Sequence, residues 1–137
     1  EADWSGKIHA DIKIPGAKHV YWVQKKDGGE FYRVSTGYGK SIVDVSPDGV
    51  VLRKLGGAAD YFFFSRPFEL ANGNIVASHW TGHSPKDSRK GPQLLEFNPA
   101  GELVWSWHDP ERAGTIHGVI ILDDDHKKTS SRKAGRR

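Results

Sequence analysis

The sequence contains no cysteine and no methionine, and it has no long hydrophobic run. Without cysteine the chain can form no disulfide framework, no thiolate zinc site and no cysteine nucleophile. No stretch approaches the roughly 18 consecutive apolar residues of a membrane-spanning helix, so we expect no membrane span. The chain opens on Glu1-Ala2-Asp3 without a methionine, which favours an N-terminus processed by signal-peptide cleavage. We therefore expect a secreted or periplasmic location.

Signals for helices and for common catalytic motifs are also missing. No window of about 11 residues keeps apolar side chains at helical spacing without a Gly or Pro interruption. The sequence has no glycine-rich phosphate loop placed between a strand and a helix, and no Gly-x-Ser-x-Gly motif. Nucleotide binding and serine hydrolase chemistry therefore have no support, and we expect no cofactor.

The positive charge of the chain is concentrated at its C-terminal end. Residues 126–137 carry six Lys or Arg and no acid, which leaves 14 basic against 17 acidic residues in 1–125. We expect 1–125 to be the folded domain and 126–137 to be a disordered basic tail. Such a tail can contact phosphates or anionic lipid. Because no aromatic residue is interleaved for base stacking, we do not expect a nucleic-acid partner.

Short alternating or β-branched runs, bounded by Gly, Pro, Asn and Asp, dominate the chain and are typical of strands joined by tight turns. Residues 7–14 alternate and predict a strand with Ile8, Ala10, Ile12 and Ile14 on one face. Further runs predict strands at 19–24, 30–35, 41–46, 50–55, 61–64, 67–70, 74–80, 93–97, 102–107 and 116–122. The sequence therefore predicts an all-β fold.

These runs recur along the chain. Residues 41–49 (SIVDVSPDG) align without a gap with residues 93–101 (QLLEFNPAG). Upstream, 20–34 resembles 68–78, and the polar loop 84–91 absorbs the difference in spacing. Residues 116–122 resemble the start of a third copy. The pattern indicates an internal repeat.

A period of roughly 40 to 50 residues with about four strands per copy is typical of a β-propeller. Each copy is then one blade, a four-stranded antiparallel sheet that must stack on its neighbours. Two full and two partial copies do not close a ring of roughly four or more blades. We expect an incomplete propeller, a fragment of a longer parent that holds the missing blades. Closure by self-association and folding as another sheet sandwich are the alternatives.

The segment 93–107 (QLLEFNPAGELVWSW) resembles a repeat of the quinoprotein-like β-propellers, which include pyrroloquinoline-quinone-type repeats and arylsulfotransferase-like secreted proteins. The phrase 70–76 (LANGNIV) is similar to the family's turn between inner strands. Residues 41–55 form a weaker copy, with Arg53 where Trp105 stands in the stronger one. The resemblance covers about 19–122 and implies a propeller architecture in a bacterial extracytoplasmic protein. It implies no particular activity, because this architecture hosts binding, lyase, transferase and dehydrogenase functions.

Six residues at predicted strand ends are candidates for a ligand site. Strand ends and their loops form the rim of a propeller's central funnel, where ligands usually bind. The candidates are His19, Arg66, His79, Trp80, His83 and His117.

Each candidate has a possible role and an alternative. His117 and His19 could act as bases or anion contacts because histidine titrates near neutrality, although their repeated position also fits a structural role. His79 and His83 have the spacing of a helical zinc pair, but Gly82 and Pro85 argue against a helix, so we expect no metal site.

Arg66 fits an anionic substrate or a neighbouring carboxylate. Trp80 could stack on a ligand. Trp105 and Trp107 are expected to pack between blades. Residues 61–64 are expected to form a buried strand, a wedge between blades or, in a truncated chain, an exposed edge. The acidic run 123–125 lacks the ligand spacing of a calcium loop and is expected to be a solvated turn.

The interpretation that follows is a ligand-binding propeller module for a small polar or carbohydrate ligand at the strand-end face. No catalytic residue is assigned. A propeller enzyme that uses histidine chemistry, such as a transferase, lyase or lactonase-like hydrolase, is one alternative. A protein-interaction scaffold is the other.

Overall fold

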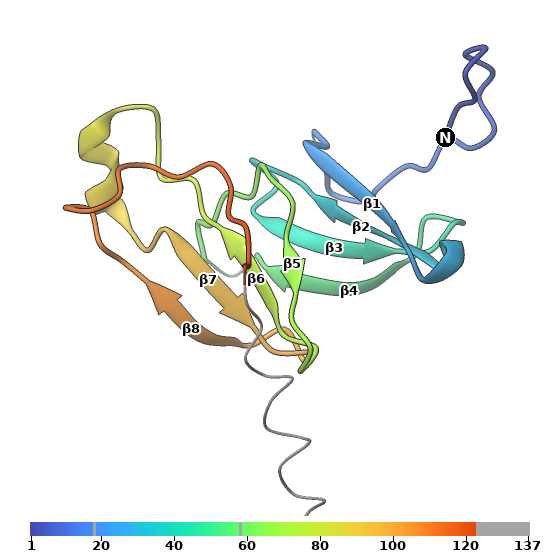
Figure 1. Ribbon diagram of the computed structural model, residues 1–137. Helices are drawn as coiled ribbons and strands as arrows, with labels where there is room; N and C mark the ends of the chain where they lie inside the picture. The colour runs from blue at the N-terminus through green and yellow to red at the C-terminus, as the bar shows by residue number, and fades with distance from the viewer. Residues whose placement is uncertain (18, 58, 123–137) are drawn as a thin grey trace, which may run out of the picture.

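The fold is all-β, as the sequence predicts, in a computed structural model that describes residues 1–17, 19–57 and 59–122. Two four-stranded antiparallel sheets follow one another along the chain, and in each sheet every strand pairs with the next one (Figure 1). The first sheet contains β1 (Trp22–Lys26), β2 (Phe31–Ser35), β3 (Ser41–Val45) and β4 (Val51–Gly56). The second contains β5 (Phe68–Glu69), β6 (Ile75–Ser78), β7 (Leu94–Phe97) and β8 (Leu103–Trp107).

The sequence repeat is also a structural repeat. β3 and β7 are the third strands of their sheets, and each is followed by the same kind of turn. In the first turn the Ser46 N–H donates to the Val50 carbonyl over 2.9 Å, and in the second the Asn98 N–H donates to the Glu102 carbonyl over 2.9 Å. Both turns end on a glycine with positive φ, +87° at Gly49 and +90° in the second turn. Only glycine adopts this conformation without strain, which explains the shared Pro-x-Gly pattern.

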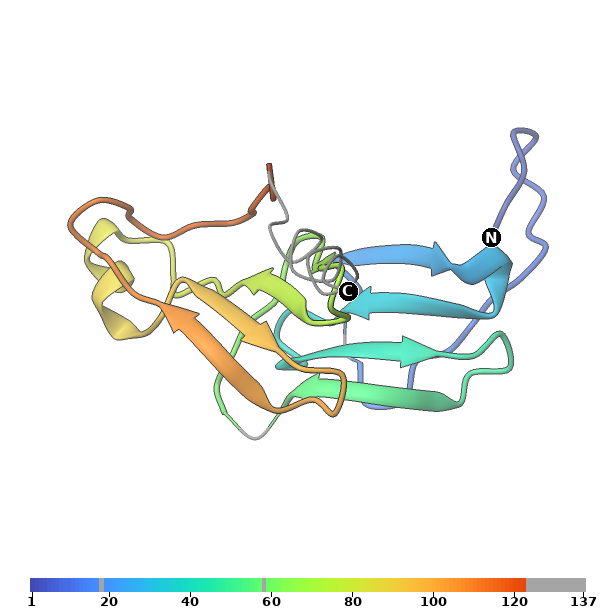
Figure 2. The ribbon, with the colours of Figure 1, turned by 60° about the horizontal axis from the view of Figure 1, so that its bottom comes forward.

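The two sheets lie next to each other (Figure 2). One apolar core is shared between them. Burying an aliphatic or phenylalanine side chain contributes about 1.5–3 kcal/mol, so this shared core holds the sheets together. Its buried members are Ile42 and Leu55 from the first sheet, Ile75, Ala77, Leu95 and Phe97 from the second, and Phe63 from the connection between them.

The N-terminal segment covers part of the outer face of the first sheet. Ile12 and Ile14 pack against Val34, Val43 and Val45 there. The predicted strand at 7–14 is wrong, because in this region the only pairing is an isolated bridge between residues 2 and 8. The alternating pattern arises because Ile12 and Ile14 pack on the face of the first sheet, and it does not indicate a strand paired at the sheet's edge.

Two other predicted strands do not form. Residues 61–64 lie between the sheets and make a single bridge, from Phe63 to Gly37. Their carbonyls accept bonds from both sides, the Phe63 oxygen from the Gly37 N–H (2.8 Å) and the Phe62 oxygen from the Trp80 N–H (2.9 Å). The segment is therefore a wedge between the sheets, one of the three expected forms. Residues 116–122 contain no strand either.

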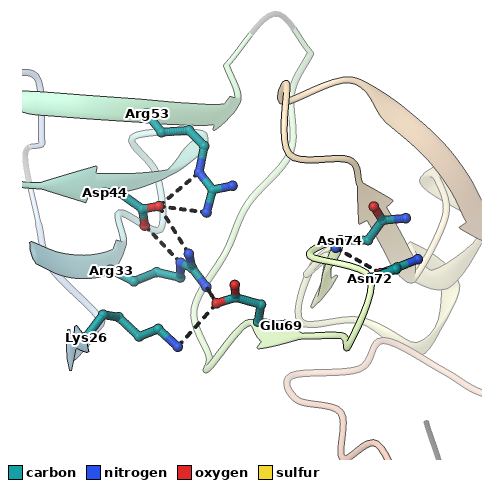
Figure 3. Close-up of polar contacts among 7 residues, drawn as sticks. All are labelled: Lys26, Arg33, Asp44, Arg53, Glu69, Asn72 and Asn74. Atoms are coloured by element: carbon teal, nitrogen blue, oxygen red, sulfur yellow. Dashed lines mark hydrogen bonds and ion pairs between the residues drawn. The ribbon is translucent and has the colours of Figure 1, made fainter. Parts of the chain in front are cut away.

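A buried ionic network joins the two sheets (Figure 3). The guanidinium of Arg33 is almost fully buried and pairs with Asp44 on β3 (2.8 Å) and with Glu69 on β5 of the second sheet (2.8 Å). Arg53 also pairs with Asp44 (2.7 Å), and Lys26 with Glu69 (3.2 Å). Burial by itself raises the pKa of Glu69, but its hydrogen bonds from Arg33 and Lys26 outweigh that effect and lower the pKa below its ordinary value.

The two ends of the sheets carry different connections. At one end are tight turns over residues 27–30, 46–50, 70–74 and 98–102. At the other end are the connections 57–67 and 79–93 and the segment that follows β8. The connection 79–93 contains the 3-10 helix η2 (Pro85–Lys90), and the first hairpin turn contains η1 (Asp27–Gly29). No helix among the described residues is long and apolar enough to cross a membrane.

Candidate functional site

A cleft of about 270 Å³ opens at the end of the molecule that carries the long connections. Since neighbouring strands are antiparallel, residues before β1 and residues after β2, β4, β6 and β8 all reach this end. The lining of the cleft comes from these connecting segments. The lining residues are Tyr21, Tyr38, Phe64, Trp80, His83 and His117.

The backbone near Gly37 brings the aromatic side chains together. Gly37 follows β2 with φ of +55°, and a Cβ atom built on it would lie 2.4 Å from the Tyr21 ring and 2.9 Å from the Phe64 ring. Only glycine allows this close approach. The Tyr21 N–H donates to the Ser35 carbonyl (3.0 Å), which fixes the residue at the start of β1. Tyr38 directly follows Gly37 and is about half exposed at the cleft.

The aromatic rings form a continuous cluster with edge-to-face contacts. Phe64 stands at its centre, with ring centroids 4.4 Å from Tyr21, 5.1 Å from Tyr38 and 5.1 Å from Trp80. Tyr38 also contacts Phe62, at 5.8 Å. Such pairs add about 0.5–1.5 kcal/mol each beyond their burial, so the walls of the cleft are held in fixed positions.

Two of the predicted histidines lie at the mouth of this cluster. The His83 ring packs edge-on against Trp80 at 4.6 Å, and the His117 ring lies tilted over Phe64 at 5.8 Å. Both side chains are exposed. The His117 carbonyl accepts a bond from the Ser78 hydroxyl (2.9 Å), which holds the segment after β8 against the end of β6.

The other three predicted positions are placed differently. His19 is exposed and touches the cluster only through Tyr21, at 6.3 Å. Arg66 lies on the surface with its guanidinium 4.9 Å from the centre of the Phe68 ring. His79 is buried, 5% exposed, beside Tyr61 and Phe62, and its Nδ1 donates to the Pro92 carbonyl (2.7 Å). The structure thus brings Trp80, His83 and His117 together and leaves the other three predicted residues outside the lining.

Sequence reasoning missed Tyr21, Tyr38 and Phe64 as parts of the site. Tyr38 had a usable signal, because an aromatic residue between Gly37 and Gly39 at a loop tip is hard to explain by packing. Tyr21 and Phe64 had no such signal, because both lie in apolar runs that are equally typical of a buried strand.

Among the described residues the lining is aromatic and imidazole, without Lys, Arg, Asp or Glu. The described residues contain no group of three or more His, Cys, Asp or Glu placed to hold a metal ion. Asp87 lies near His83, but its carboxylate accepts the Ser84 N–H (3.0 Å) and pairs with Lys90 (2.7 Å), and these contacts lower its pKa below the ordinary value. The cleft can therefore offer flat ring faces, phenol hydroxyls and imidazole nitrogens to a ligand.

The acidic run 123–125 and the basic tail 126–137 lie outside the described residues. Their predicted roles stay predictions.

Comparison with known proteins adds to the fold and not to the site. No protein-family model matches the chain, and no curated protein matches it. The structure is similar to the crystal structure of a protein of unknown function from Bacteroides caccae, with a TM-score of 0.64 and 25% sequence identity. The match covers 82% of this chain and 42% of that one, so this chain spans less than half the length of its structural relative. The likeness supports the all-β arrangement and assigns no function.

Proposed function

We propose that the protein is a ligand-binding module that takes a neutral carbohydrate in the cleft at the long-connection end. The observation that carries this proposal is the set of aromatic and imidazole side chains lining the cleft. Sugar rings present apolar C–H faces that stack on aromatic rings, and their hydroxyls need neutral donors and acceptors at the rim. Tyr38 and Trp80 provide the faces, and Tyr21, His83 and His117 provide the polar groups.

Neutral ligands are favoured over charged ones because the lining residues that the structure describes carry no charged side chain. A charged ligand loses its hydration on entering a cleft, and without a partner charge that loss is not repaid. Arg66, the predicted anion contact, lies outside the lining, which weakens the case for an acidic ligand.

The proposal includes the architecture, in which each sheet is one blade of a quinoprotein-like β-propeller in an extracytoplasmic protein. Its support is the repeat of two four-stranded sheets with matching turns, joined to each other by the connection 57–67 at the long-connection end. In a propeller this end is where ligands usually bind, which agrees with the position of the cleft.

The test is isothermal titration calorimetry of the purified chain against neutral disaccharides (maltose, cellobiose and lactose). We expect at least one to bind, and Tyr38→Ala to weaken that binding about tenfold, since one stacking contact contributes about 1.4 kcal/mol. Trp4→Ala is the control, because Trp4 is an exposed aromatic residue that lines neither the cleft nor the groove beside the first sheet. The proposal fails if no sugar binds, or if the Trp4 variant loses binding while the Tyr38 variant keeps it.

A further inference from the structure

The second sheet presents an outer row of side chains, formed by Val76, Glu96 and Trp105, on the face turned away from the shared core. These residues lie opposite one another on β6, β7 and β8. Their strand neighbours Ile75 and Leu95 point into the core, so alternation places the row on the other face. Trp105 is 45% exposed, which is unusual for so large an apolar side chain on a strand.

The equivalent row of the first sheet makes the contact between the two sheets. Arg33, Asp44 and Arg53 lie opposite one another on β2, β3 and β4, as the outer row does on β6, β7 and β8. In the first sheet this row receives Glu69 from β5 of the sheet that follows. The outer row of the second sheet is therefore equivalent to the row of the first sheet that contacts the second sheet.

The partner position on the first sheet has the opposite charge. Arg33 and Val76 are equivalent residues, and their partners on the first strands are Gln24 and Phe68. The residues that follow these partners, Lys25 and Glu69, are therefore also equivalent. Glu69 pairs with Arg33, whose equivalent in the outer row is the uncharged Val76. The acid available to Lys25 is Glu96 on the next strand, which corresponds to Asp44 and already accepts a hydrogen bond from the Asn74 side-chain amide (2.6 Å).

The outer face of the first sheet also has room for a large apolar side chain. A groove of about 380 Å³ lies between the N-terminal segment and this sheet. Its walls are mainly aliphatic, with Ile12, Ile14, Val23 and Val34 among them, and Lys25 is part of its lining. The side chain beside Glu96 in the outer row is Trp105, which matches such a groove in size and polarity.

A hydrogen bond between successive units is repeated as well. The Ser35 hydroxyl at the end of β2 donates to the Ser65 carbonyl (2.8 Å), which begins the path into the second sheet. The Ser78 hydroxyl at the end of β6 donates in the same way to the His117 carbonyl (2.9 Å). The Ser78 bond on the outer side of the second sheet is thus equivalent to the Ser35 bond between the first sheet and the second.

We propose that a second copy of this chain docks the outer face of its first sheet onto the outer row of the second sheet. Trp105 fills the groove, and Glu96 pairs with Lys25 of the docking copy. Lys25 already pairs with Glu1 (2.7 Å), so it would lie between two carboxylates, as Arg33 does between Asp44 and Glu69. The contact is head-to-tail, and repetition of it closes a ring or extends a filament. It is independent of the ligand cleft.

The experiment measures the solution mass of the purified chain by multi-angle light scattering across a range of concentrations. We expect a multiple of 15.2 kDa. Glu96→Lys and Lys25→Glu should each raise the concentration for half-association at least tenfold, because each sets like charges against one another. The double variant should restore association to within about threefold. Trp105→Ala should also raise the concentration at least tenfold by removing the apolar anchor.

Glu111→Lys is the matched control, because it makes the same charge change at an exposed position outside these faces. It should leave the mass unchanged. Far-UV circular dichroism of every variant establishes that the sheets are intact. Titration with the disaccharide measures ligand binding in the cleft separately from association. A chain that stays monomeric at all concentrations overturns the proposal. So does a multimer that tolerates both single charge reversals, or one that the double variant fails to restore.

Discussion

The imidazole of His79 occupies the place that a hydroxyl occupies in the first sheet. Thr36 follows β2, and its Oγ1 donates to the Ser41 carbonyl (2.7 Å) at the start of β3. His79 follows β6, and its Nδ1 donates to the Pro92 carbonyl (2.7 Å) just before β7. Both side chains tie the second strand of a sheet to the approach of the third. His79 is therefore a structural residue, although its neighbour Trp80 lines the cleft.

Protonation of His79 should destabilise the fold. Burial lowers its pKa below the ordinary value of 6.5, and hydrogen bonds to the carbonyls of Pro92 and Asp60 offset only part of that effect. The unfolded chain then binds the proton more readily, so stability is complete above pH 6.5 and falls as the pH drops below it. We expect His79→Gln to reduce the slope of the melting temperature between pH 7 and pH 5. Equal slopes in thermal melts of the two proteins would exclude this role.

At the scale of elements, the network around Arg33 links β2, β3 and β4 to β5 of the next sheet. The side chain of Arg33 is 2% exposed, whereas that of Arg53 is 25% exposed and pairs with Asp44. Arg33 is thus a buried cation that links the two sheets, whereas Arg53 is a partly exposed cation within the first sheet.

Removal of Arg33 should cost much more than removal of Arg53. Breaking a buried pair costs about 3–5 kcal/mol, and the lower end applies here because Asp44 keeps Arg53 and Glu69 keeps Lys26. We expect Arg33→Met to lower the free energy of unfolding by about 3 kcal/mol, and Arg53→Met by about 1 kcal/mol or less. Urea denaturation of both variants measures the difference. Equal losses would mean that the network does not join the sheets.

The strands and turns of the two sheets were predictable because each sheet is built from local antiparallel pairs. Tight turns such as 46–50 and 98–102 carry their own Gly and Pro signals. Segments 7–14 and 61–64 have the same strand-like pattern but pack against a face or between sheets. Alternation predicts that one side of a segment is buried, and it does not say whether the backbone has a partner strand.

The site was predictable only in part for a related reason. The expectation that strand-end residues gather at one rim led to Trp80, His83 and His117. Tyr21 and Phe64 reach the cleft because Gly37 lets three segments approach closely, and such a contact has no local signature.

At the scale of the whole molecule, the two ends of the sheets have different roles. The matching turns of the two sheets lie at the tight-turn end, and the aromatic cleft lies at the long-connection end. Longer loops tolerate change in sequence, so binding residues collect on them while a rigid sheet fixes their positions. The shared core makes the two sheets one unit, which keeps the two sides of the cleft in register.

The most direct test of this account is a titration of the ¹⁵N-labelled chain with the best-binding neutral disaccharide, followed by amide chemical shifts. The account predicts changes at 19–21, 36–40, 62–65, 79–84 and 115–118, with little change in the turns 46–50 and 98–102 at the opposite end. Changes confined to those turns or to the outer row of the second sheet, or no changes at all, would contradict it.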